Sequence, residues 1–228
     1  MKRWTARLLA AGLALTLAAC GSTPATGGTG QTAPATASLS EGLPSGDRIL
    51  IAYFSVPETD GVDTVSGASR VVVDGTVLGN NQYLAQLLQG ETGGDLFPLE
   101  PADPYTDEDL NWTDESSRVV QEHDNPEARD VALVADTVDN WEAYDTVFLG
   151  YPIWWGIAAW PVDTFVAAND FTGKTVIPFC TSSSSGIGES GQLLADLAGT
   201  GDWQEGQRFS SHVDRDAVET WLAGLGLA

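Results

Sequence analysis

Continuously apolar segments alternate along this chain with segments whose apolar residues recur at helical spacing. Arg48–Phe54 (RILIAYF) is the clearest apolar run, and such a run is typical of a β-strand buried on both faces. Asn81–Gln89 (NQYLAQLLQ) follows it and places Leu84, Leu87 and Leu88 on one side of a helix. An alternation of this kind predicts a parallel sheet that is covered by helices on both faces.

The same two patterns continue to the end of the chain. Four further strands are expected at Asp95–Leu99, at Tyr144–Gly150, at Lys174–Cys180 and within Asp202–Phe209. Helices are expected at Pro126–Val138, Ala158–Ala168, Glu189–Ala198 and Asp214–Leu225, and Asp107–Glu122 is expected to be a helix or an ordered excursion. Asn125 and Pro126 have the residue types preferred at a helix N-cap and first position. The expected fold class is therefore α/β, a three-layer α/β/α sandwich with a five-stranded parallel sheet.

The first 20 residues have the pattern of a targeting segment. Met1–Arg7 is basic, and Leu8–Ala19 is an apolar run of signal-peptide length. The run ends in Leu-Ala-Ala-Cys, which resembles the lipobox of bacterial lipoproteins, with Cys20 as the residue that is lipidated. We expect a protein held at the extracytoplasmic face of the cell membrane by this lipid anchor alone. An ordinary secretory signal with an incidental cysteine is the alternative.

A tether separates this segment from the globular domain. Gly21–Ser38 contains only Gly, Ser, Thr, Pro, Ala and Gln, a composition that is typical of a flexible linker. We therefore expect a tether over residues 21–45 and one domain over residues 46–228.

With 43% hydrophobic residues the chain is not wholly disordered. The chain has a net charge of -22 and few basic residues that could form a basic face, so nucleic acid is not an expected partner.

Three loops follow the strands, where ligands bind in open parallel sheets. The first carries Ser55, Asn80 and Asn81. Together with the amides of a helix N-terminus these side chains suit a phosphate, although a plain turn with Asn80 or Asn81 as N-cap would explain them too. The second loop, Gly150–Gly156, carries Trp154 and Trp155. Two flat rings at a strand end suit a planar aromatic ligand, and packing into the core beside Trp160 is the alternative.

The third loop, Thr181–Gly188, combines hydroxyl side chains with glycines that let a ligand approach the backbone. A solvated serine-rich turn is the alternative.

Cys180, just before this loop, follows an apolar segment and is expected to be a buried structural thiol. His123 and His212 are expected on the surface, and the sequence has no cysteine and histidine cluster with zinc spacing, so no metal site is expected.

Together the three loops resemble the flavodoxin family. The segments ILIAYFS, LGNNQYLAQLL, VFLGYPIWWG and IPFCTSSSSGIGES are similar to the branch with an extended first loop. The resemblance implies a flavodoxin-like fold and bound FMN, with phosphate contacts from Ser55, Asn80 and Asn81. It implies flavin-ring contacts from Pro152, Ile153, Trp154, Trp155 and Gly156, and contacts on the other flank from Thr181, Ser182, Ser183, Ser184, Gly186, Ile187 and Gly188. The implied function is electron transfer or NAD(P)H-dependent reduction, with a redox partner protein or small-molecule acceptor that the sequence does not identify.

Two residues depart from the family pattern. Asn81 stands where the family commonly has threonine, and the carboxylate of Glu58 would repel a phosphate. These departures favour the main alternative, a tethered interaction module without a cofactor. A further alternative is a hydrolase that uses Ser190, or another serine of the third loop, together with His212.

Overall fold

The computed structural model describes residues 48–64 and 66–227. The expected signal peptide, Cys20 and the tether lie outside the described residues. Within them, no helix combines the length and the apolar character that crossing a lipid bilayer requires.

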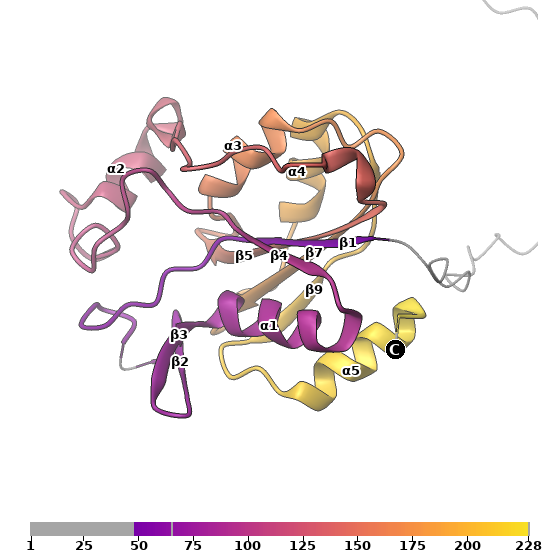
Figure 1. Ribbon diagram of the computed structural model, residues 1–228. Coiled ribbons are helices and arrows are strands. Elements are labelled where there is room, and N and C mark those ends of the chain that lie inside the picture. The colour runs from indigo at the N-terminus through magenta and orange to yellow at the C-terminus, as the bar shows by residue number, and fades with distance from the viewer. Residues whose placement is uncertain (1–47, 65, 228) are drawn as a thin grey trace, which may run out of the picture. The chain divides into compact units, whose positions relative to one another are not determined.

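A parallel sheet forms the centre of the fold (Figure 1). Its order is β4 (Asp95–Pro98), β1 (Ile49–Tyr53), β5 (Thr146–Trp154), β7 (Thr175–Ser182), followed by two short strands that both pair with β7. These are β8 (Asp202–Trp203) and β9 (Gln207–Ser210), and they share the position that we expected a single fifth strand to fill. The chain passes from β1 to β4 on one side and then returns to β5 on the other, so the topological switch point lies between β1 and β5.

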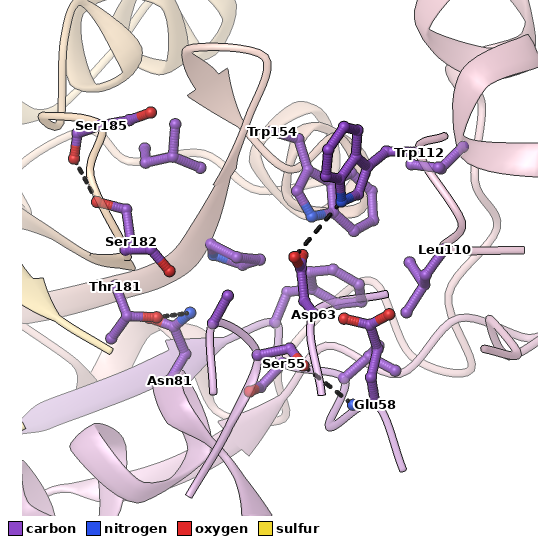
Figure 2. A pocket seen from close by; sticks show the side chains of 18 of the residues that line it. Ser55, Glu58, Asp63, Asn81, Leu110, Trp112, Trp154, Thr181, Ser182 and Ser185 are labelled. Atoms are coloured by element: carbon purple, nitrogen blue, oxygen red, sulfur yellow. Dashed lines mark hydrogen bonds between the residues drawn. The ribbon is translucent and has the colours of Figure 1, made fainter. Parts of the chain in front are cut away.

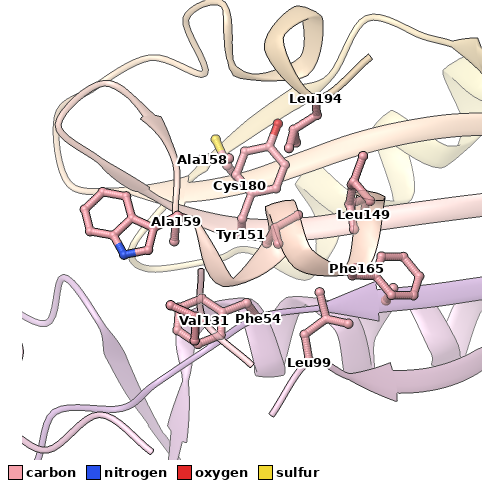
Figure 3. Close-up of a cluster of buried hydrophobic side chains, with 14 of the residues drawn as sticks. Phe54, Leu99, Val131, Leu149, Tyr151, Ala158, Ala159, Phe165, Cys180 and Leu194 are labelled. Atoms are coloured by element: carbon pink, nitrogen blue, oxygen red, sulfur yellow. The ribbon is translucent and has the colours of Figure 1, made fainter. Parts of the chain in front are cut away.

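Helices cover both faces of this sheet (Figure 1). Helices α1 (Asn80–Thr92) and α5 (Arg215–Leu225) pack on one face, and α3 (Pro161–Ala168) and α4 (Ser190–Ala198) pack on the other. Successive residues of β1 alternate between the two cores, because side chains of a strand point to opposite faces. Ile51 belongs to the core under α1, while Leu50 and Ala52 belong to the core under α3. Figure 3 shows that second core, including Leu149 and Tyr151 of β5. The α/β sandwich predicted from the sequence is confirmed.

The connection from β1 to α1 contains a β-hairpin that the strand pattern did not predict. Strands β2 (Arg70–Val73) and β3 (Thr76–Gly79) are antiparallel and pair with each other. Asp74 and Gly75 join them, with φ of 50° and 81°. An Asp-Gly pair with two positive φ angles is a preferred two-residue hairpin turn, so the signal was present in the sequence between two runs of valine and leucine.

The predicted helix over Pro126–Val138 is wrong. Only a 3₁₀ turn, η1 (Pro126–Arg129), forms there, and the side chain of Asn125 makes no capping hydrogen bond. The following residues use their backbone groups for long-range bonds instead: the carbonyl of Val131 accepts from Thr164, and Leu133 forms a bridge with Pro101. Tertiary contacts have overridden local propensity here.

The segment Asp107–Glu122 is mainly an ordered excursion of turns. Its regular part is the short helix α2 (Arg118–Asp124), which begins after Ser117, whose hydroxyl accepts from the Val120 amide. A further 3₁₀ turn, η2 (Trp141–Ala143), precedes β5.

Strand β5 continues beyond the expected Gly150 and turns back on itself. It pairs with the antiparallel β6 (Ile157–Ala158), and the turn consists of Trp155 and Gly156. Both have positive φ, 45° for Trp155 and 83° for Gly156. A tryptophan in this region of φ is uncommon, and the hairpin holds it there beside the strand ends.

Gly150 is required by the close approach of β5 and β7. A Cβ atom at Gly150 would overlap the ring of Phe179, its partner in the strand register. We expect Gly150→Ala to lower the free energy of unfolding by about 1–3 kcal/mol, because the added methyl group overpacks a filled core. Gly90→Ala is the matched control: Gly90 is exposed on α1 and a Cβ there meets nothing within 4 Å. This variant should be as stable as wild type or more stable by up to about 1 kcal/mol. Urea unfolding of the two variants measures the difference, and equal midpoints would contradict the packing argument.

Candidate functional site

A cavity of about 360 Å³ opens at the carboxyl ends of β1, β5 and β7 (Figure 2). Its volume lies within the usual range of small-molecule sites. Each strand supplies its last residues or those just after it, namely Phe54 and Ser55, Pro152 to Trp155, and Thr181 to Ser185. The three loops singled out in the sequence therefore meet at the switch point, as the rule for open parallel sheets requires.

In the first loop, Ser55 and Asn81 line the cavity and Asn80 does not. Asn81 is buried, and its Nδ2 donates to Thr181 Oγ1 at 2.9 Å, which joins the first loop to the third. The Nδ2 of Asn80 instead donates to the carbonyls of Gly67 and Ala68. Asn80 thus fastens the long connection to the start of α1.

The N-terminus of α1 reaches this edge of the sheet because its N-cap is a glycine. A Cβ at Gly79 would overlap Ser55 Oγ as the serine is placed here, so glycine lets the helix end lie directly against this hydroxyl. The first turn of α1 holds no acidic residue. The positive end of the helix dipole therefore lies close to a cavity-lining hydroxyl, an arrangement that favours an anion.

The second loop places both tryptophans at the cavity. Trp154 lines it and also touches Trp160 edge-on at 4.8 Å between ring centroids. Trp155 stacks on His123 at 4.5 Å and remains 45% exposed. The two interpretations of this loop are therefore compatible, since the rings border the cavity while packing beside Trp160. Gly156 does not line the cavity.

The third loop contributes the side chains of Thr181, Ser182, Ser183 and Ser184, and also Ser185, which we did not predict. Arg208 of β9 holds this loop: its Nε donates to Ser182 Oγ at 3.0 Å and its Nη2 donates to the Ser182 carbonyl at 2.7 Å. Gly186, Ile187 and Gly188 lie outside the cavity lining, and Ile187 packs against the core instead.

A second wall comes from residues that the sequence patterns did not mark as part of a site. Asp63 of the first connection and Leu110, Trp112 and Val119 of the excursion after β4 all line the cavity. The Trp112 indole nitrogen donates to Asp63 Oδ1 at 3.4 Å, so the two segments meet at this wall (Figure 2). Trp112 is 54% exposed, and a tryptophan in a polar, acidic stretch was the one sequence signal that could have indicated it.

The charged groups at the cavity are all acidic. Among the described residues, the lining includes Glu58 and Asp63 but no Lys, Arg or His. Glu58 is buried, and its Oε1 has no hydrogen-bond partner in the described part of the chain. Burial raises the pKa of Glu58, and the neighbouring carboxylate of Asp63 raises that pKa further. Figure 2 shows Glu58 and Asp63 beside Leu110 and Trp112, away from Asn81 and Thr181. The cavity thus has an acidic, aromatic end and an uncharged end of hydroxyl and amide groups.

The described residues do not bring together the serine and histidine side chains that the hydrolase alternative requires. Ser190 is fully buried, its hydroxyl donates to the Ile187 carbonyl at 2.6 Å, and it also contacts the Tyr151 hydroxyl at 3.0 Å. His212 is exposed, and its ring contacts Ser211 rather than a serine of the third loop.

Cys180 is buried, as expected, and burial raises the pKa of its thiol to about 12. A thiol with so high a pKa is protonated at neutral pH and is not a nucleophile. His123, which we expected on the surface, is partly covered by its stack on Trp155. In residues 48–64 and 66–227, no group of three or more His, Cys, Asp or Glu side chains could hold a metal ion.

Comparison with known proteins gives the class of this fold and site. A flavodoxin family model matches residues 70–225. A structure from Bacteroides eggerthii, classed as a flavoprotein, shares 34% identity and has a TM-score of 0.64, over 80% of this chain and 99% of that chain. A second, from Bacteroides uniformis, shares 31% identity with a TM-score of 0.63, over 78% and 99% of the two chains.

The chain belongs to the flavodoxin family. A flavoprotein from Lactobacillus acidophilus, whose structure contains FMN, has the same fold: 18% identity and a TM-score of 0.50, over 77% of this chain and 98% of that one. A comparison with curated proteins found no match.

Proposed function

We propose that this protein binds FMN without a covalent bond and transfers electrons, as a carrier or as a reductase. The observation that carries the proposal is the cavity itself. It lies at the switch point, an anion-favouring helix N-terminus and hydroxyl groups border it, and tryptophan rings form part of its wall. A ligand with a phosphate and a large planar ring system would use both kinds of wall.

The residues present fit this cofactor at both ends. Ser55, Asn81 and the N-terminus of α1 would hold the phosphate, since Gly79 brings that helix against the Ser55 hydroxyl. Trp154 and Trp155, with Pro152 and Ile153, would hold the flavin ring on one side, and Thr181 to Ser184 would hold its other flank. Asn80 would act indirectly by fixing the first loop. The proposed contacts are limited to residues that line the cavity.

Bound FMN supplies reversible uptake of electrons, and the protein sets how readily this occurs. Glu58 and Asp63 add negative charge to the cavity wall, and the whole chain has a net charge of -22. Negative charge near the flavin disfavours the addition of electrons. The chain should therefore lower the reduction potential of FMN relative to FMN in water. The redox partner is a protein or a small-molecule acceptor.

We also propose that the protein is anchored at the extracytoplasmic face of the membrane through a lipidated Cys20. The support is the lipobox pattern that ends the N-terminal apolar run.

The absorbance spectrum of the purified chain tests the cofactor. We expect flavin absorbance, and release of FMN on heating, identified by mass spectrometry.

Trp154→Ala should weaken FMN binding by about tenfold or more, because ring contact and exclusion of water are lost together. Titration with FMN, followed by flavin fluorescence, measures this change. A wild-type chain without flavin absorbance and without FMN binding would instead favour the cofactor-free interaction module.

Glu58 provides a test of how the two ends of the cavity are assigned. Its carboxyl group lies at the acidic, aromatic end, away from Asn81 and Thr181. Glu58→Gln should therefore change the affinities for FMN and riboflavin by the same factor, and it should raise the reduction potential of the bound flavin because a negative charge near the ring is lost. Glu115→Gln, an exposed glutamate outside the cavity, is the matched control. An effect of Glu58→Gln on FMN that riboflavin does not share would place the phosphate beside Glu58 and contradict this assignment.

Cys20→Ser tests the anchor. The variant should be absent from the membrane fraction of cells that express it, because the thiol that carries the lipid is missing. Immunoblots of soluble and membrane fractions make the comparison, and equal membrane association of variant and wild type would contradict the anchor.

A further inference from the structure

Trp154 is held at the cavity by three other aromatic rings. Its centroid lies 5.5 Å from Phe54, 5.4 Å from Tyr105 and 4.8 Å from Trp160, and the interplanar angles of 88°, 76° and 68° make all three contacts edge-to-face. Edge-to-face contacts have a preferred angle and not only a preferred distance. The orientation of the Trp154 ring therefore depends on where Tyr105 and Trp160 are fixed.

One carboxylate fixes both of those rings. Glu122 of α2 is 6% exposed, and its Oε2 accepts hydrogen bonds from the Tyr105 hydroxyl and from Trp160 Nε1, each at 2.7 Å. Tyr105 precedes Glu122 in the chain by 17 residues and Trp160 follows it by 38, so these bonds join three separate segments. Burial raises the pKa of Tyr105, and the bond to Glu122 raises it further, which keeps the phenol protonated as a donor.

The charge of Glu122 is compensated by Arg118, one turn earlier on the same helix. Arg118 Nε donates to Glu122 Oε1 at 2.8 Å, and its guanidinium carbon lies 4.0 Å from the centroid of the Tyr105 ring. A buried carboxylate is tolerated when it is paired and fully hydrogen-bonded, and replacing such a group with apolar residues is often neutral for stability or favourable. A buried charge of this kind is therefore not needed simply to fill the core, whereas its bonds fix the positions of two rings.

We propose that Glu122 is a positioning residue for the flavin: through Tyr105 and Trp160 it fixes the angle at which Trp154 meets the flavin ring. This inference rests on the proposed function. It assigns to the excursion after β4 a role in shaping the ring end of the site, at a distance from the phosphate end.

A variant that disturbs the ring end of the site can be distinguished from one that disturbs the phosphate end by comparing its affinities for two flavins. FMN and riboflavin have the same ring system and differ in the phosphate, so a fault at the ring end should weaken both by the same factor. Glu122→Gln loses the ion pair with Arg118 and replaces one acceptor oxygen with a donor group. We expect about tenfold weaker binding of both flavins, together with a changed visible circular dichroism spectrum of the bound flavin.

Tyr105→Phe is the second variant, since it keeps the ring and removes only the hydroxyl donor. It should weaken both flavins in the same way but by about threefold. Tyr144→Phe is its matched control, because Tyr144 also donates to a carboxylate and has an arginine against its ring, whereas only Tyr105 has a ring contact with Trp154. The Tyr144 hydroxyl donates to Asp95 Oδ2 at 2.8 Å, and Arg48 lies 4.8 Å from the centroid of the Tyr144 ring. Tyr144→Phe should leave flavin affinity and the flavin spectrum as they are in wild type, and Glu115→Gln should do the same.

Flavin titrations and visible circular dichroism of these four variants, with urea unfolding to confirm folding, decide the question. Equal losses for FMN and riboflavin in Glu122→Gln and Tyr105→Phe, absent from both controls, would support the positioning role. Unchanged affinity and spectrum in these two variants would overturn it, as would a loss in Tyr144→Phe equal to that in Tyr105→Phe. If the wild-type chain binds neither flavin, the proposed function itself fails and the positioning role fails with it. Binding by wild type with no effect of Glu122→Gln or Tyr105→Phe defeats the positioning role alone.

Discussion

The parallel pairing of β1 with β5 and of β5 with β7 is the constraint on which the rest of the molecule depends. Buried on both faces, these strands need two helix layers, and alternate side chains supply both cores. Polar groups have little room along such strands and gather where the strands end. Ser55, Thr181 and Ser182 lie at those ends, and the cavity forms between them. The same pairing that forms the core therefore also determines where a ligand can bind.

Much of the cavity wall is built by chain that lies outside this regular framework. The long connection after β1 supplies Glu58 and Asp63, and the excursion after β4 supplies Leu110 and Trp112. Hydrogen bonds across the two segments hold them: Asp107 of the excursion accepts from the backbone amides of Thr59 and Asp60 in the connection. Because both segments leave from strand ends, they extend the site without changing the sheet.

The sequence predicted the regular framework well, because its signals are local. A run such as RILIAYF contains its own evidence for a buried strand, and the positions of the three loops follow from the strand order. The Asp74-Gly75 hairpin was equally visible in principle, since its turn chemistry is local. The loop motifs were sufficient to bring Ser55, Asn81, Trp154 and Thr181 to one cavity.

The remaining features depend on contacts between distant segments. Pro126–Val138 has an acceptable helix start, yet its backbone bonds to Thr164 and Pro101, and no local pattern reveals those partners. Asn80 and Asn81 are identical in type and adjacent, but one faces the connection and the other the cavity. Glu122 lies in a polar segment whose composition is typical of solvent-exposed residues. Its burial becomes evident only when Tyr105 and Trp160 are brought to it by the fold.

The electrostatics of the cavity follow from this division between the regular framework and the irregular segments after β1 and β4. The framework supplies hydroxyls, amides and the positive end of the α1 dipole, which act over a few ångströms. The long connection after β1 supplies two carboxylates to the opposite end, and no described cation lines the wall. An anionic group would therefore be held by local dipoles within a negative surrounding field, so its binding depends on exact placement. A neutral ring system is less sensitive to that field and depends on ring contact instead. For this reason the two ends of the cavity are built by different interactions. At the uncharged end, Gly79 lets the N-terminus of α1 lie against Ser55. At the aromatic end, the buried carboxylate of Glu122 fixes the positions of aromatic rings.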